Sequence, residues 1–233
     1  MNIWFTSDTH FAHKNLCLGS TEWPIELNPD ALRDFKDQWH MSDHLVNQIN
    51  KYVKEDDILY HVGDWSFGGP ENIKLYRDRI VCKTIHLVLG NHDDYIMDNI
   101  VVGEYQSGQD TFLIRAQDLF ASVSDRKVVK RGKKGRRMIL DHYAMRTWHH
   151  AHKGSYQLHG HSHASLELPH RQNPINSFYN KYRTMDVGMD NAKRIFGEYK
   201  PFHYNWILEY LEPRPSLGID HHDPNNSSYK DER

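Results

Sequence analysis

Short apolar runs that end in polar clusters recur along the chain. Three of them occupy residues 2–7, 58–62 and 84–89, and each has the length and residue types of a buried strand. Apolar positions at helical spacing fill the intervals at 28–52 and 70–80. The order strand, polar loop, helix predicts an α/β architecture.

The segment from Asn28 to Tyr52 carries the strongest helix signal. Asn28 is a good N-cap, Pro29 suits the first helical position, and Leu32, Phe35 and later apolar residues repeat at about helical spacing. A single long helix over 28–52 is therefore expected.

The second half of the chain has a different order of predicted elements. Residues 124–129 and 137–140 predict two strands joined by a glycine-rich basic turn, which is the pattern of a β-hairpin and indicates a second sheet. Further strands are predicted at 156–159 and 184–187. The apolar run at 206–211 is too short for periodicity to decide between a strand and a short helix.

Composition limits the broad class of the protein. Its 233 residues, 38% hydrophobic and 26% charged with a net charge of −2, fit one globular domain over 1–212. The polar stretch 213–233 is expected to be a poorly ordered tail. The two cysteines form no C-x-x-C pair, and no basic leader or apolar run of about 18 residues is present. A cytoplasmic protein without a membrane partner is expected.

The chain contains 18 histidines, an unusually large number, and their positions indicate what they do. Several follow predicted strand ends, where open α/β sheets gather ligands. Asp8 and His10 stand one residue apart, so on an extended exit both can reach one ion. The candidate metal ligands are Asp8, His10, Asp64, Asn91, His142, His161 and His163. Such a mixed nitrogen and oxygen set favours first-row ions over calcium: Mn²⁺ first, with iron, Zn²⁺ or Ni²⁺ as alternatives.

Each fragment alone is commonly an ordinary turn or cap, but the order of the fragments is informative. The motifs read Asp8-Thr9-His10, Gly63-Asp64, Gly90-Asn91-His92-Asp93, His142 and Gly160-His161-Ser162-His163. This series resembles the calcineurin-like metallophosphoesterase family, whose pattern is D-x-H, G-D, G-N-H-[D/E], H and G-H-x-H.

The resemblance implies a fold and a two-metal site. The fold would be a four-layer α/β/β/α sandwich of two mixed sheets flanked by helices. One ion would be held by Asp8, His10, Asp64 and His163, and the other by Asp64, Asn91, His142 and His161, with Asp64 shared. A hydroxide bridging the two ions would then attack phosphorus, and His92, outside both ligand sets, would act as the general acid.

The sequence departs from the protein phosphatases of that family. They carry G-D-x-x-D-R-G, whereas this chain reads G-D-W-S-F-G-G from Gly63, which argues against a Ser/Thr protein phosphatase. Its start is more similar to small bacterial and phage phosphoesterases. There His13, Lys14 and Asn15 would either contact substrate phosphate or form an exposed polar loop, and the sequence does not decide between the two.

Other residues near the motifs have competing interpretations. Asp93 would orient His92 or fix its loop, and Asp186 and Asp190 would buttress the site or, as the pattern favours, cap turns. Aromatic residues near the motif loops could stack a nucleobase, although core packing is favoured for most; they are Trp65, Phe67, Tyr95 and Trp148. The basic run 130–137 is more typical of a solvated turn than of a polyanion site. Five more histidines have no assigned role: His149, His150 and His152 line the site or are exposed, and His221 and His222 belong to the tail.

The expected function is hydrolysis of a small, nucleotide-like phosphoester, either a diester or a monoester. One alternative is a nuclease acting on single-stranded nucleic acid. A non-catalytic protein-binding module is less favoured, because no ligand of the motif series is missing. The sequence does not predict the oligomeric state.

Overall fold

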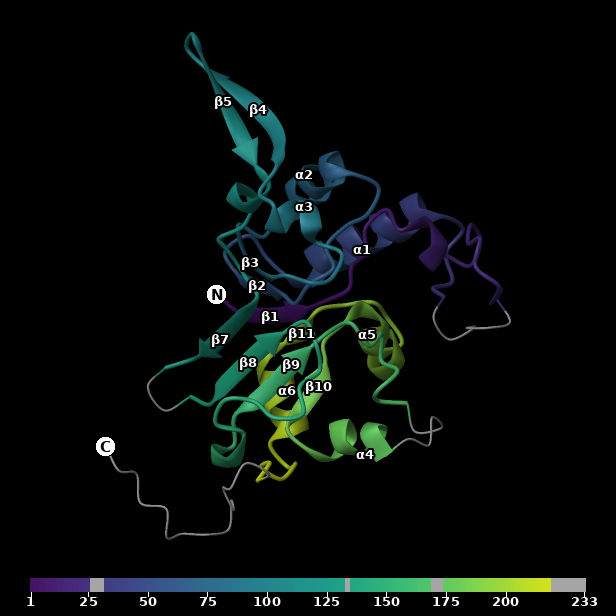
Figure 1. The fold of residues 1–233 in the computed structure, drawn as a ribbon, viewed down its shortest axis with the longest axis vertical. Coiled ribbons are helices and arrows are strands. Elements are labelled where there is room, and N and C mark those ends of the chain that lie inside the picture. The colour runs from purple at the N-terminus through teal and green to yellow at the C-terminus, as the bar shows by residue number, and fades with distance from the viewer. Residues whose placement is uncertain (26–31, 133–134, 169–173, 219–233) are drawn as a thin grey trace.

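Two stacked β-sheets form the centre of the computed structural model, which describes residues 1–25, 32–132, 135–168 and 174–218 (Figure 1). The first sheet has the order β11-β1-β2-β3-β6. Its strands are β1 (Ile3–Thr6), β2 (Ile58–His61), β3 (Thr84–Val88), β6 (Ser122–Ser124) and β11 (Phe202–His203). The first four run parallel and β11 is antiparallel to β1, so this sheet is mixed.

The second sheet has the order β10-β9-β8-β7. It consists of β7 (Arg126–Lys130), β8 (Arg137–Asp141), β9 (Tyr156–His159) and β10 (Thr184–Asp186). The antiparallel pair β7–β8 is the expected hairpin, while β8, β9 and β10 run parallel. Ser124 ends a strand of the first sheet and Arg126 begins one of the second, so the predicted strand 124–129 spans the crossing between them.

Helices cover the outer faces of both sheets. Over the first sheet lie α1 (Gln38–Tyr52), α2 (Pro70–Arg79) and α3 (Asp94–Met97), and the remaining helices are α4 (Pro174–Lys181), α5 (Met189–Phe196) and α6 (Tyr204–Leu211) (Figure 1). Short 3-10 turns occur at Lys14–Leu16, Ala116–Leu119 and Ala151–Lys153. The run 206–211, left open above, is helical.

Strand alternation explains the layers. Ile3 and Phe5 of β1 pack with Leu140 and Leu158 of the second sheet, while Trp4 between them packs with the helices. On the outer face of the second sheet, Ile139 belongs to another apolar cluster, with Trp148 and α4 residues. The expected α/β/β/α sandwich with two mixed sheets is confirmed.

The prediction of a helix over 28–52 is wrong at its start. Residues 26–31 lie outside the described residues, and α1 begins only at Gln38. The Asp37 side chain accepts hydrogen bonds from the backbone N–H groups of Trp39 and His40 and is the actual cap. Arg33 instead pairs with Cys17 in an isolated β-bridge.

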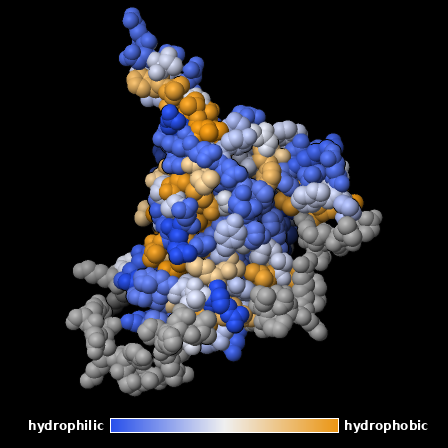
Figure 2. Space-filling model, viewed as in Figure 1, coloured by the Kyte–Doolittle hydropathy of each residue, from blue (hydrophilic) through white to orange (hydrophobic). Residues whose placement is uncertain are grey.

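A projecting hairpin was not predicted. Strands β4 (Val101–Ser107) and β5 (Asp110–Arg115) form a separate two-stranded sheet that extends from the α2 and α3 side. Phe112 and Leu113 on it are exposed, and Figure 2 shows hydrophobic side chains along the arm below a hydrophilic tip.

The expected tail begins with packed residues. Arg214 donates hydrogen bonds to the carbonyl oxygens of Tyr179, Tyr182 and Thr184, and Leu217 is buried. The rest of the expected tail, 219–233, lies outside the described residues. None of the helices in the described ranges is long and apolar enough to cross a membrane.

Candidate metal centre

The loops that follow β1, β2, β8 and β9 meet at one edge of the two sheets. Asp8 N donates to Gly63 O (2.9 Å) and His10 N to Asp64 O (3.1 Å), so the pairing of β1 with β2 continues beyond the strands. In the second sheet, Gly160 N donates to His142 O (3.0 Å). Asp8 joins the two sheets, because its carboxylate accepts from His161 N (3.0 Å).

The backbone at this edge is unusual. Nine described non-glycine residues have positive φ, and five of them are sequence-predicted ligands: Asp8, His10, Asp64, His161 and His163. Left-handed backbone is unfavourable for residues with a Cβ and clusters at functional sites. The hydrogen bonds between the loops hold these residues in that conformation.

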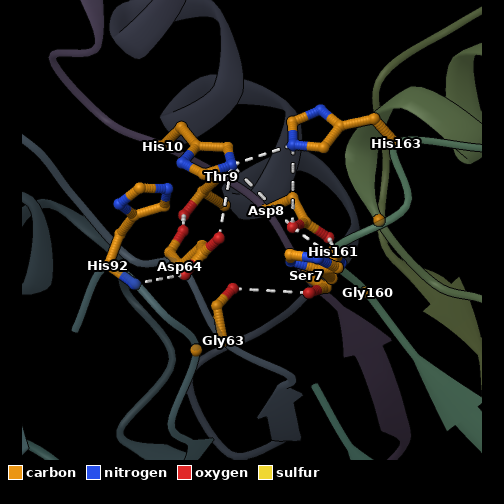
Figure 3. A network of polar contacts seen from close by, with 12 residues as sticks. Ser7, Asp8, Thr9, His10, Gly63, Asp64, His92, Gly160, His161 and His163 are labelled. Carbon is orange, nitrogen blue, oxygen red and sulfur yellow. Dashed lines mark hydrogen bonds and ion pairs between the residues drawn. The ribbon is translucent and has the colours of Figure 1, made fainter. Parts of the chain in front are cut away.

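Two groups of potential ligand atoms result, and Figure 3 labels Asp8, His10, His163, Asp64 and His161 of them. One contains Asp8, His10 and His163, the other Asp64, His142 and His161, and within each group the atoms lie within 4.8 Å of one another. Oδ2 of Asp64 lies 3.3 Å from Nε2 of His142 and 3.6 Å from Nε2 of His10. This carboxylate therefore stands between the groups, in the place that a bridging ligand needs.

The second group also includes the amide of Asn91. Its Oδ1 lies 3.0 Å from Nε2 of His142 and 2.8 Å from Nδ1 of His161. The other ring nitrogen of His142, Nδ1, lies 2.8 Å from Val62 O and can donate to it, which leaves Nε2 free as a ligand atom. All seven predicted ligands are brought to this one edge.

The donor atoms suit divalent cations. Nε2 of His10 and Nε2 of His163 face each other at 3.1 Å, while Nδ1 of the buried His10 has no hydrogen-bond partner. Two imidazole nitrogens pointed at one place beside the Asp8 carboxylate are the arrangement expected of metal ligands. The residues present therefore fit the metal pair that the motifs imply.

Charge at the edge favours cations as well. Although burial opposes it, a hydrogen bond to Asp64 and the negative charges of Asp8 and Asp64 raise the pKa of His142 to about 9. Burial raises the pKa of Asp8 to about 6, and burial lowers the pKa of His10 well below its ordinary value. The carboxylates thus create a negative field around partly desolvated histidines, in which a dication would compete with protons for the ligand atoms.

Behind His163 lies a buried ion pair that sequence reasoning only partly anticipated. Nδ1 of His163 lies 2.7 Å from Oδ2 of Asp190, and Arg33 donates to both oxygens of that carboxylate at 2.8 Å. Arg33, 1% exposed, also donates to the carbonyl oxygens of Asp8 (2.6 Å) and Thr9 (3.0 Å). Burial opposes ionisation, yet Arg33 and His163 hold the pKa of Asp190 well below its usual range.

Two other carboxylates fix the loops. Asp93 accepts from the backbone N–H groups of Asp64 (2.9 Å), Trp65 (2.9 Å) and Gly90 (2.8 Å), which corresponds to the loop-fixing interpretation rather than to a partner for His92. Asp186 accepts from Ser162 Oγ (2.6 Å) and the N–H of Ala164 (2.9 Å), so it buttresses the G-H-x-H loop.

At two motif glycines, another loop comes so close to the backbone that there is no room for a Cβ. Gly63 has φ +96°, and a Cβ there would collide with the His142 ring. A Cβ at Gly160 would collide with Ser7 Oγ and the Asp8 carboxylate. Only glycine lets these loops come together.

His92 lies beside Asp64 and His10 (Figure 3). Its backbone N–H donates to Oδ1 of Asp64 (2.9 Å), and its exposed ring neighbours the rings of His10 (5.8 Å) and Phe67 (4.7 Å). The side chain is outside both ligand groups.

The remaining sequence candidates divide between site, core and surface. Lys14 pairs with Glu22, and the Asn15 side chain accepts from Glu22 N, so both tie their loop together. His13 contacts the Phe67 ring, whereas Trp65 and Trp148 are buried core residues and Tyr95 is exposed.

The basic turn and the later histidines lie away from the metal centre. Arg136 pairs with Glu212, and Arg137 donates to His150. His149, His150 and His152 line a hollow of about 710 Å³ beside β7 and β8 rather than either ligand group. His221 and His222 lie outside the described residues.

The comparisons with known proteins agree with this geometry. The family model described as calcineurin-like phosphoesterase matches residues 1–165, which contain every motif of the centre. Among solved structures, the protein of unknown function AQ665 from Aquifex aeolicus is similar in fold, with a TM-score of 0.59 and 20% identity over 90% of this chain and 99% of that one. A search of curated proteins finds no match. With the motifs in order, assembled at one sheet edge and covered by the family model, the chain belongs to the calcineurin-like phosphoesterase family.

Proposed function

We propose that this protein hydrolyses phosphoesters with two divalent cations bound at the two ligand groups. The observation that supports this most is the position of Asp64, whose Oδ2 is within 3.6 Å of a histidine nitrogen from each group. Two dications bound there would activate a water molecule and neutralise charge on the phosphoryl oxygens. Mn²⁺ is the cation we favour, with iron, Zn²⁺ or Ni²⁺ as alternatives.

The residues around the cations have separate tasks in this proposal. Asp8, His10 and His163 bind on one side, and Asn91, His142 and His161 on the other. His92 holds a proton on a ring nitrogen and delivers it to the departing oxygen, which its exposed place beside the ligands allows. The substrate we favour is a small nucleotide-like phosphodiester or phosphomonoester.

Metal content and turnover of two variants test the proposal. The wild-type chain should bind two Mn²⁺ and hydrolyse p-nitrophenyl phosphate or bis-p-nitrophenyl phosphate. His92→Ala should keep both ions but lose about 100-fold or more in kcat, since general acid catalysis contributes about 10²–10⁴. Asp64→Ala should lose bound metal as well. A wild-type chain that binds no metal and stays inert towards both esters with each of the four cations would contradict the proposal.

A single-strand nuclease remains the alternative. It would need the basic turn to hold a strand, but Arg136 is paired with Glu212. Proteins that bind nucleic acid mainly through phosphate contacts lose about 10³–10⁵ in affinity between 50 and 200 mM salt. Cleavage of single-stranded DNA that falls steeply over this salt range would favour the nuclease.

A further inference from the structure

Aromatic rings form a continuous series from the metal centre outwards. The Phe67 ring lies 5.4 Å from the ring of the ligand His10 and 4.7 Å from that of His92. On its other side it meets His13 edge-on at 3.9 Å, and His13 lies 5.6 Å from Trp23. We call Phe67, His13 and Trp23 the aromatic wall.

The wall is not part of the protein core. Phe67 and Trp23 belong to none of the three apolar clusters of the described residues. Trp23 is 44% exposed and Phe67 is partly exposed. Exposed aromatic surface contributes little to folding, whereas a ring that stacks on it regains the free energy of burial.

Backbone contacts hold the wall in place before any ligand binds. Phe67 N donates to Phe11 O (2.8 Å), and the Asn72 side chain donates to Phe67 O (2.7 Å). The loop that carries Trp23 is tied by the contacts of Glu22 with Lys14 and Asn15. A preformed surface of this kind binds a rigid ring at low cost in conformational entropy.

The Phe67 end of the wall lies next to His92, and this position decides which part of the substrate the wall can contact. In the proposed hydrolysis, a water molecule loses a proton to solvent and its oxygen bonds to phosphorus as the bond from phosphorus to the leaving oxygen breaks. The leaving oxygen takes the proton of His92, and His92 regains a proton from solvent. The leaving alcohol therefore departs on the side of His92, where Phe67 and His13 follow. A ring attached to this alcohol would lie against the wall.

We infer that the aromatic wall stacks a flat ring carried by the leaving alcohol, so that the substrate is a phosphoester of a nucleoside. This inference rests on the proposed function for the role of His92. Base stacking on aromatic side chains is sequence-tolerant, since every base has a π-face. The wall therefore selects for the presence of a base rather than for one base.

A set of three diesters tests this inference in the Mn²⁺-loaded protein. They are the dinucleotide thymidylyl-thymidine and the two analogues that each lack one of its bases, and product analysis identifies the leaving nucleoside. Removing the base of the leaving nucleoside should lower kcat/KM by at least about fivefold. This factor corresponds to about 1 kcal/mol, the lower end of the free energies of base stacking on aromatic side chains. Removing the other base should have a smaller effect.

Variants of the wall should remove the same preference. Phe67→Ala should lower kcat/KM for the dinucleotide by at least about fivefold and leave the analogue without the leaving base nearly unchanged, while Phe67→Tyr should restore the preference. Phe112→Ala removes an exposed phenylalanine that lies on the projecting hairpin, and it should change neither rate. Equal rates for all three diesters would overturn the inference while leaving hydrolysis established.

Binding separates a failure of the inference from a failure of the proposed function. If no ester is hydrolysed, the proposed function fails, and calorimetry can still compare thymidine monophosphate with deoxyribose 5-phosphate. Binding of the nucleotide at least about fivefold tighter in the wild type but not in Phe67→Ala would support stacking on the wall. Equal affinities would overturn it.

Discussion

Replacing Asp190 by asparagine removes the negative charge that joins Arg33 to His163. The asparagine keeps the shape of the side chain and can still accept from Nδ1 of His163. It no longer makes the 2.8 Å ion pair with Arg33, and it no longer strengthens the basicity of the His163 ring. The variant therefore tests whether this carboxylate supports one ligand group in particular.

Two magnitudes are expected from the structure. Loss of an outer carboxylate partner of a ligand histidine lowers metal affinity by about 10- to 100-fold. Arg33 is buried and would lose its carboxylate partner, and breaking a buried pair costs about 3–5 kcal/mol. Because the Asp190 side chain is 18% exposed, the lower figure applies, and about 3 kcal/mol lowers Tm by about 6–12 °C in a chain of this size.

Calorimetric titration of the metal-free protein with Mn²⁺, well below Tm, separates these effects. The group of Asp8, His10 and His163 should bind about 10- to 100-fold more weakly, and the group of Asn91 and His142 should keep its affinity. Asp57→Asn is the matched control, because Asp57 is a buried carboxylate that accepts three hydrogen bonds but has no contact with the centre.

The control variant defines the outcome that would refute the reasoning. Asp57→Asn should lower Tm and leave both affinities for Mn²⁺ unchanged. If Asp57→Asn weakened metal binding as much as Asp190→Asn, or if Asp190→Asn weakened both groups equally, the effect would come from general loosening and not from His163.

Further predictions concern the loops, acid stability and metal removal. Gly160→Ala should abolish Mn²⁺ binding in calorimetry, since the added Cβ would collide with the Asp8 carboxylate and Ser7. Hydrogen bonds from Asn2, Lys54 and Trp4 outweigh burial and lower the pKa of Asp57, so its contribution is present above the unfolded pKa of about 3.9 and is lost as pH falls through the folded value. Urea unfolding should therefore show that the difference in stability between wild type and Asp57→Asn shrinks below about pH 4. Free Mn²⁺ at 100 times Kd should stabilise the chain by about 2.7 kcal/mol per site, and a chelator should reverse the Tm increase in a thermal scan.

The sequence predicted the strands that lie in the core. Each of β1, β2 and β3 is a run of mostly apolar residues followed by a polar motif. Burial on both faces requires apolar residues in the strand, and the motif beyond it carries the candidate metal ligands. β4 and β5 escaped prediction since Phe112 and Leu113 lie on an arm that is exposed to solvent, where no core imposes a pattern.

Local sequence signals predicted the wrong start for helix α1. Asn28 and Pro29 have the residue types of a helix start, but Asp37 performs the capping, and Arg33 makes a long-range contact instead. The partner of Arg33, Asp190, is 157 positions away in the sequence. Neither periodicity nor a local motif can predict such a contact. The motif spacing predicted which residues would gather at the edge, but not the ion pair behind them.

The hydrogen bonds between the ligand loops also bear on how quickly the protein exchanges its cations. Asp8, His10 and His161 are positioned by backbone contacts that do not involve a cation. Arrival or departure of an ion would then require no refolding, only ligand exchange with release or uptake of protons. If the protein binds cations as proposed, the ion that each molecule carries should follow the supply of cations around it over time. A change in that supply would then exchange the bound ion without new synthesis.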